Sequence, residues 1–250
     1  MAAVSDIRIN IINKTYRLAH DSRQFHHAIA DLDLTVHPHQ FVCLVGPSGC
    51  GKTTLLNMIA GLDPYFDGQI RMGNVEQSPT IGYVFQNPRL LPWRTVRENI
   101  ELVFADTPPA TLIDSLLDSM QLRDAQHQYP ERLSLGMQRR VAIIRAFAIN
   151  PDILLMDEPF VSLDAPSARQ VRSLLYGLWQ QRPHTVLFVS HDLREAIALA
   201  DRLIFLSRSP MRILSDLVVP IARDQRHDEA QIEAFREQLL LNHPVISELL

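Results

Sequence analysis

Cysteine and glycine are scarce in this chain of 250 residues, which contains two cysteines and nine glycines. Two cysteines cannot form the disulfide framework of a small secreted protein. No apolar run approaches the roughly 18 residues that cross a bilayer, and the N-terminus lacks the basic and apolar blocks of a secretory signal. An excess of positive charge is also missing, since the net charge is −4 and the pI about 6.2, so we expect no nucleic-acid partner. These absences favour a protein of the cytosol.

The composition, with 46% hydrophobic and 21% charged residues, is that of a folded chain with one large or two closely packed domains. Short continuous apolar runs are typical of buried parallel strands, and five occur, at 41–45, 81–85, 153–156, 185–189 and 203–206. Helical patterns between several of them favour an α/β fold. Apolar residues alternate with polar ones at 32–36, which together with 7–12 and 69–72 predicts an antiparallel β patch near the N-terminus.

The middle of the chain is punctuated by prolines with helical patterns between them. After Ser134, apolar residues recur at helical spacing as far as the pair Asn150-Pro151, which predicts an amphipathic helix that ends there. A second amphipathic helix is predicted at 228–241. We therefore expect one domain over residues 1–250, with an inserted helical subdomain at 87–150 and a C-terminal extension at 215–250.

Three of the nine glycines fall within the six residues from Gly46 to Gly51. They belong to a glycine-rich turn that follows an apolar run and opens a helical pattern, the context of a phosphate-binding loop. There the backbone N–H groups and the helix N-terminus face phosphate oxygens, Lys52 reaches the β- and γ-phosphates, and the Thr53 hydroxyl ligates Mg²⁺. The residues expected to bind the nucleotide in this segment are Gly46, Pro47, Ser48, Gly49, Cys50, Gly51, Lys52, Thr53 and Thr54.

An acidic pair, Asp157-Glu158, follows the apolar run at 153–156. An aspartate at the end of a buried strand can hold the metal ion, and the following glutamate can polarise an attacking water. Alone the pair is weak evidence, because carboxylates often cap helices. Together with the phosphate loop it predicts nucleotide hydrolysis.

These motifs resemble those of the ATP-binding subunits of ABC transporters, and the resemblance covers about residues 7–210. Gln86, in Tyr-Val-Phe-Gln, resembles the family's Q-loop glutamine, and Asp164, in Ser-Leu-Asp, resembles its D-loop. His191, in Val-Ser-His-Asp, resembles the switch histidine that contacts the γ-phosphate. Tyr16 stands where the family places an aromatic that stacks on adenine.

The segment 133–137, Leu-Ser-Leu-Gly-Met, stands where the family has its Leu-Ser-Gly-Gly-Gln signature. The resemblance implies that Ser134 and Gly136 bind the nucleotide held by the opposite subunit of a dimer. Leu135 replaces the first glycine. If Ser134 is the N-cap, Leu135 is the first helical residue and needs no positive φ, so we expect a working site.

The resemblance implies an α/β fold with a P-loop NTPase (RecA-like) core, which binds ATP and Mg²⁺. Glu158, His191 and Gln86 would serve catalysis, and Thr53, Gln86 and Asp157 would serve the metal. The implied partners are a second copy of the chain, integral membrane permease subunits and, indirectly, a solute-binding protein. The implied location is peripheral, at the cytoplasmic face of the inner (cell) membrane.

The segment 90–96, Leu-Leu-Pro-Trp-Arg-Thr-Val, resembles importers of nitrate, sulfonates and taurine, a group with relatives linked to pyrimidine precursors. Trp93 is either a permease contact or part of a core. Two other functions stay open: a soluble ABC-type ATPase whose nucleotide-dependent dimerisation acts as a switch, and a subunit that binds ATP without hydrolysing it.

Cys50 lies within the phosphate loop, where Lys52 and the helix N-terminus can lower the pKa of its thiol and make it reactive. The alternative is an inert small residue. Cys43, on the preceding strand, is expected to pack in the core.

Overall fold

The computed structural model describes residues 6–18, 21–73 and 78–249. The N-terminal residues 1–5, whose composition argues against a secretory signal, lie outside the described residues. The chain divides into two compact units, one formed by 1–78 with 185–250 and the other by 79–184.

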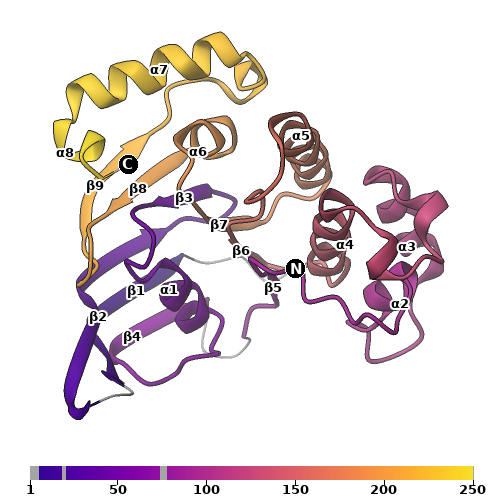
Figure 1. Cartoon of the computed structure of the whole chain (residues 1–250), viewed down its shortest axis with the longest axis horizontal. Helices are drawn as coiled ribbons and strands as arrows, with labels where there is room; N and C mark the ends of the chain where they lie inside the picture. The colour runs from indigo at the N-terminus through magenta and orange to yellow at the C-terminus, as the bar shows by residue number, and fades with distance from the viewer. Residues whose placement is uncertain (1–5, 19–20, 74–77, 250) are drawn as a thin grey trace. The chain divides into compact units, whose positions relative to one another are not determined.

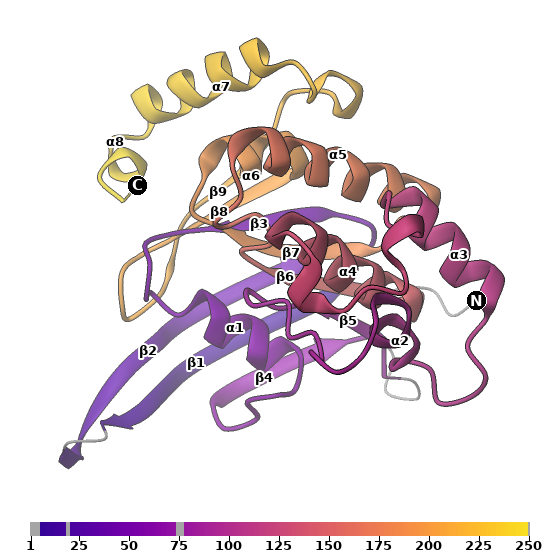
Figure 2. The ribbon, with the colours of Figure 1, turned by 45° about the vertical axis from the view of Figure 1, so that its right-hand side comes forward.

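The first unit contains an antiparallel sheet in the order β2-β1-β4. Its strands are β1 (Ile7–Leu18), β2 (Asp21–Val36) and β4 (Asp67–Met72), and β1 and β2 form a long hairpin (Figure 2). Alternate residues of the hairpin are buried, and their register sets Ile9 opposite Leu34. The antiparallel patch predicted from the alternation is therefore present, with longer strands.

The same unit contains four strands of a largely parallel sheet, in the order β7-β3-β8-β9. They are β7 (Thr185–Ser190), β3 (Phe41–Val45), β8 (Arg202–Leu206) and β9 (Ile213–Val218). β3 lies between β7 and β8 and is parallel to both, while β9 is antiparallel to β8 (Figure 1). Every residue of β3 and β7 is buried, as the continuous apolar runs predict.

Helices follow two of these strands: α1 (Lys52–Ile59) follows β3, and α6 (Leu193–Leu199) follows β7. Val45 pairs with Ser190, so β3 and β7 end side by side. In an open α/β sheet, ligands bind at the carboxyl ends of the strands. The turns that begin at Gly46 and at His191 therefore share one edge of this sheet.

The C-terminal residues also belong to the first unit. They form a 3₁₀ turn at Arg223–Gln225 and the helices α7 (Glu229–Asn242) and α8 (Pro244–Ser247). The predicted helix at 228–241 corresponds to α7, which packs against α6. The short helix α8 was not predicted.

The second unit contains the parallel pair β5 (Ile81–Val84) and β6 (Ile153–Asp157). Between them along the chain lie α2 (Val96–Glu101), α3 (Ala110–Ser119) and α4 (Leu135–Ala148), with 3₁₀ turns at Arg123–Ala125 and Pro130–Arg132. Helix α5 (Ala165–Gln181) follows β6. α4 packs on α2, α3, α5 and β5. In the described part of the chain, no helix is long and apolar enough to cross a membrane.

Candidate nucleotide-binding site

The glycine-rich loop joins β3 to α1, as predicted. At Gly46 the chain runs so close to β8 that a Cβ atom would lie 3.0 Å from the carbonyl oxygen of Leu206. Gly51 has φ of 115°, a left-handed conformation that side chains disfavour. Glycine is therefore required at both ends of the loop, for space at one and for backbone conformation at the other.

Lys52 holds the loop from inside. Its side chain is buried, and Nζ donates hydrogen bonds to the carbonyl oxygens of Gly46 at 2.7 Å and Pro47 at 2.8 Å. Among the described residues, no side chain caps the N-terminus of α1. The first N–H groups of this helix are therefore available to an anion, and the exposed Thr53 hydroxyl lies beside them. The loop fits a polyphosphate.

Cys50 is buried in the loop, with its Sγ atom 4.0 Å from Lys52 Nζ. Burial raises the pKa of the Cys50 thiol, and the opposing charge of Lys52 is too weak to reverse this. Desolvation that outweighs the nearby cation favours an inert small residue over a reactive thiolate at Cys50. Cys43 is fully buried in β3, as expected for core packing.

Tyr16, in β1, has a half-exposed ring and a well-anchored hydroxyl. Its Oη donates to Asp63 Oδ2 at 2.7 Å and lies 3.4 Å from Thr54 Oγ1 in α1. Asp63 Oδ1 accepts a hydrogen bond from the buried Lys14 at 2.6 Å, whose Nζ also lies 4.5 Å from the centre of the Tyr16 ring. Burial, and then the negative charge of Asp63, raise the pKa of Tyr16. The ring is thus fixed beside the first turn of α1.

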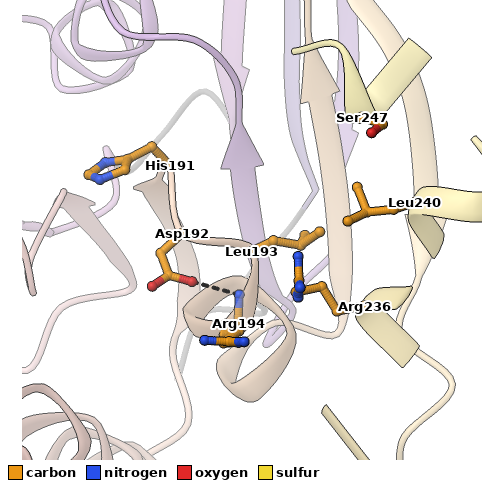
Figure 3. Close-up of a pocket in the computed structure, with 7 residues that line it drawn as sticks. All are labelled: His191, Asp192, Leu193, Arg194, Arg236, Leu240 and Ser247. Atoms are coloured by element: carbon orange, nitrogen blue, oxygen red, sulfur yellow. Dashed lines mark hydrogen bonds between the residues drawn. The ribbon is translucent and has the colours of Figure 1, made fainter. Parts of the chain in front are cut away.

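His191 follows β7 and is exposed. Asp192 caps α6 by accepting a hydrogen bond from the Arg194 N–H at 2.8 Å. A cavity of about 460 Å³ borders this turn and is lined by residues 191–194, Arg236, Leu240 and Ser247. In Figure 3 the His191 ring points away from Leu240 and Ser247.

The second unit brings Gln86 and Glu158 together. Gln86 Nε2 donates a hydrogen bond to Glu158 Oε2 at 3.1 Å. Glu158 has φ of 44°, a left-handed conformation that is uncommon for a residue other than glycine and that clusters at functional sites. Asp157, at the end of β6, is buried, and its charge adds to burial in raising the pKa of Tyr83. The acidic pair thus comprises one buried carboxylate and one more accessible carboxylate, which contacts an amide.

Ser134 is the N-cap of α4, and its Oγ accepts a hydrogen bond from the Met137 N–H at 3.2 Å. Leu135 is the first residue of the helix, which confirms that leucine fits this position. Asp164 caps α5 in the same way, accepting from the Ser167 N–H at 3.0 Å, and this hydrogen bond is the first cause of the lowered pKa of Asp164. Asp164 therefore has a structural role of its own.

The side chain of Trp93 is 68% exposed, so the alternative of a core residue is wrong. Asn99 holds the turn beneath it, accepting from the Leu91 N–H at 2.7 Å and donating to the carbonyls of Leu91, Arg94 and Thr95. No sequence motif indicated four residues that position others here, namely Asn99, Lys14, Asp63 and Arg139. None of the four carried a local signal, and Lys14 lies beyond the strand predicted at 7–12.

Comparison with known proteins supports one family. A family model described as an ABC transporter matches residues 29–161. The aliphatic sulfonates import ATP-binding protein SsuB of Bacillus licheniformis is 38% identical and covers 85% of each chain. The nitrate import ATP-binding protein NrtD of Synechococcus elongatus is 38% identical over 82% of this chain and 79% of its own. The taurine import ATP-binding protein TauB of Escherichia coli is 42% identical over 78% and 80%.

Two solved structures of the ABC transporter cassette MJ0796 also match. Its dimer has a TM-score of 0.73 with 28% identity, covering 86% of this chain and all of that one. The dimeric post-hydrolysis state bound to ADP and phosphate matches with a TM-score of 0.73 and 27% identity.

The loop between β3 and α1, at the end of a buried parallel strand, defines a P-loop nucleotide-binding protein. More particularly, the chain belongs to the ABC transporter family. The predicted family, the cassette fold with its N-terminal antiparallel sheet, and the ATPase activity are confirmed.

Proposed function

We propose that this chain powers the import of a small solute, such as an aliphatic sulfonate, nitrate or taurine, through a partner permease at the cytoplasmic face of the cell membrane. The observation that carries the proposal is the 38–42% identity to ATP-binding proteins of such importers over most of the chain. A solute-binding protein then delivers the solute, and a pyrimidine precursor is the second candidate solute.

Residues 46–54 bind the phosphates of ATP in this proposal. Lys52 exchanges its two carbonyl partners in the loop for oxygens of the β- and γ-phosphates, and the Tyr16 ring stacks on adenine. Thr53, Gln86 and Asp157 hold Mg²⁺, which, when bound, neutralises charge on the phosphates. The geometry that supports this part is the uncapped start of α1 beside an exposed threonine hydroxyl.

Glu158 is the proposed general base. Its carboxylate accepts the proton of the attacking water, and the hydrogen bond from Gln86 orients it. His191 donates a hydrogen bond to the γ-phosphate. The shared sheet edge of β3 and β7 supports this role of His191, because it brings the turn at His191 to the loop that begins at Gly46.

Two copies of the chain enclose two nucleotides. In each site the N-terminus of α4, with Ser134 and Gly136, binds the nucleotide of the other copy, and Asp164 contributes from the neighbouring turn. The dimers formed by the MJ0796 cassette support this arrangement. Trp93 and its turn contact the permease, which the exposure of this large apolar side chain supports.

Glu158→Gln tests the hydrolytic step. Turnover should fall by about 10²–10⁴-fold, the usual contribution of a general base. The substituted amide still offers an oxygen to Gln86, so ATP binding should persist and ATP-bound dimers should accumulate in gel filtration. Glu237→Gln, an exposed position on α7, is the matched control and should retain wild-type phosphate release. Full activity of Glu158→Gln would remove this residue from the mechanism.

The partner is tested with the same variant. Tagged Glu158→Gln, incubated with ATP and solubilised native membranes, should co-purify with an integral membrane permease identified by mass spectrometry. Lys52→Ala, which loses the loop's cation, is the control for nucleotide dependence and should recover less permease. Recovery of soluble partners alone would favour the dimerisation switch over the importer.

A further inference from the structure

Arg139 lies in α4, five residues after the helix N-cap Ser134, and only 4% of its surface is exposed. Arginine is almost never buried to this degree unless it is paired. Its partners therefore indicate what the buried charge is for.

The guanidinium group binds backbone carbonyls of two separate segments. Nη1 donates to the carbonyl oxygens of Phe85, at 3.5 Å, and of Gln86, and Nη2 donates to that of Val161 at 3.3 Å. One segment follows β5 and carries the Gln86 side chain. The other follows β6 and carries Glu158. A planar fork of donors can hold two such segments at a fixed separation, which a lysine ammonium cannot do.

Burying the Arg139 guanidinium group in this way costs free energy of folding. Burial lowers the pKa of Arg139, and the negative charge of Glu158 acts against that effect. Among the described residues, no group accepts a hydrogen bond from the buried Nε atom. An unsatisfied buried donor destabilises a fold, and an apolar side chain in place of a buried charge is often neutral or better. Stability alone does not explain an arginine here.

The two segments that Arg139 connects carry Gln86 and Glu158, whose side chains meet. The contact between Gln86 Nε2 and Glu158 Oε2 requires both segments to keep their places. Glu158 and Ser162 both have left-handed backbone conformations, with φ of 44° and 64°, and such conformations persist only when their surroundings over-determine them. The two hydrogen bonds from Arg139 to the carbonyls of Gln86 and Val161 supply that restraint from the α4 side.

We propose that Arg139 is a positioning residue for ATP hydrolysis: it sets Gln86 against Glu158 and connects this pair to the helix that begins at Ser134. A displacement at the start of α4 then changes the placement of the Gln86–Glu158 pair. This inference rests on the proposed role of Glu158 as general base.

The test compares the ATPase kinetics of the full-length homodimer with Arg139 replaced. Arg139→Met should lower kcat by about 10²-fold, the loss expected from a misplacement of about 1 Å in an active site. KM for ATP should stay within about threefold, because the phosphate loop is untouched. Arg139→Lys keeps the charge without the fork, so its kcat should lie between those of the wild type and Arg139→Met.

Arg140→Met is the matched control. Arg140 is the next residue of α4 and loses the same charge, but its Nη1 donates to the carbonyl of Met120 at 2.9 Å, away from both segments. Its kcat should stay within about twofold of wild type. An equal fall in kcat for Arg140→Met, or a rise in KM without a fall in kcat for Arg139→Met, would overturn the inference.

A double-mutant cycle separates positioning from folding. Because Arg139 acts through Glu158, adding Arg139→Met to Glu158→Gln should lower the residual rate by less than about threefold. A full further 10²-fold loss would show that Arg139 acts elsewhere and would overturn the inference.

If Arg139→Met fails to fold, Arg139→Lys takes its place in the cycle, and a wild-type kcat for it would overturn the inference too. If Glu158→Gln alone is fully active, the proposed function fails first, so the two failures are distinguishable.

Discussion

Tyr16, which we propose to stack on adenine, is held by side chains that belong to none of the sequence motifs. The Tyr16 hydroxyl shares the Asp63 carboxylate with Lys14, so the ring has one orientation beside α1. Base–aromatic stacking depends on that orientation, because the ring must present its face to the base.

Replacing Tyr16 separates stacking from anchoring. Tyr16→Ala should weaken binding of a non-hydrolysable ATP analogue by about 1–3 kcal/mol, the value of base stacking. Tyr16→Phe keeps the ring and loses one hydrogen bond, so we expect a smaller loss of about 0.5–1.5 kcal/mol. Isothermal titration calorimetry measures both. Tyr65→Phe is the control, since the Tyr65 ring is 83% exposed and only its carbonyl oxygen contacts Lys14. Wild-type affinity of Tyr16→Ala would contradict adenine stacking.

At this scale the sequence identifies residues whose chemistry depends on short spacings. Gly46, Lys52 and Glu158 are recognisable because each belongs to a run of fixed order after a strand. Lys14 and Arg139 are not, because their partners lie 49 and 53 residues away, at Asp63 and Gln86. Their burial is a tertiary property that no local pattern encodes.

At the scale of elements, a continuous apolar run predicts a buried strand well, since β3, β6 and β7 are buried throughout. The edge strand β9 escaped detection because its burial alternates between half-buried and exposed, and its apolar residues Leu214 and Val218 lie on the exposed side. The positions of apolar residues alone therefore do not predict which face of this edge strand is buried.

Asp201 connects three elements of the first unit. It accepts hydrogen bonds from the Phe41 N–H at the start of β3, and from Arg223 and Arg226 in the C-terminal residues. Burial alone would raise the pKa of Asp201, but these hydrogen bonds and the two positive charges lower it below its ordinary value.

The pH dependence follows from that direction. A carboxylate with a lowered pKa contributes stability above its unfolded-state pKa, about 3.9, and the contribution is lost as the pH falls through the lower folded-state pKa. Asp201→Asn should therefore lower the free energy of unfolding by about 2–4 kcal/mol at pH 7, and its difference from wild type should shrink towards pH 3. Urea denaturation across this range measures it. Asp216→Asn, which breaks the ion pair of the 40% exposed Asp216 side chain with Arg202, should cost about 1 kcal/mol or less. An equal cost for both variants would contradict the role of Asp201.

At the scale of the whole molecule, the proposed importer requires that hydrolysis reach the permease through a surface that the catalytic motifs do not include. The turn at residues 91–95 fits this role, because the buried Asn99 satisfies its backbone groups and holds the exposed Trp93 outward. Large exposed aromatic side chains are typical centres of protein interfaces. The surface is therefore separable from the ATPase site by mutation.

Trp93→Ala should leave the ATPase rate of the purified subunit within about twofold of wild type, because this exposed side chain is not among the residues proposed to bind or hydrolyse ATP. In proteoliposomes with the permease, the same variant should lose solute-stimulated hydrolysis, with a binding loss of at least about 2 kcal/mol if Trp93 is a hot spot. Leu241→Ala, at a side chain 80% exposed on α7, is the control and should keep full stimulation. Asn99→Ala should reproduce the uncoupled behaviour with Trp93 intact, because four backbone groups of the turn each lose a hydrogen bond with the Asn99 side chain. A Trp93→Ala subunit that responds normally to the permease would assign the coupling to another surface of the chain.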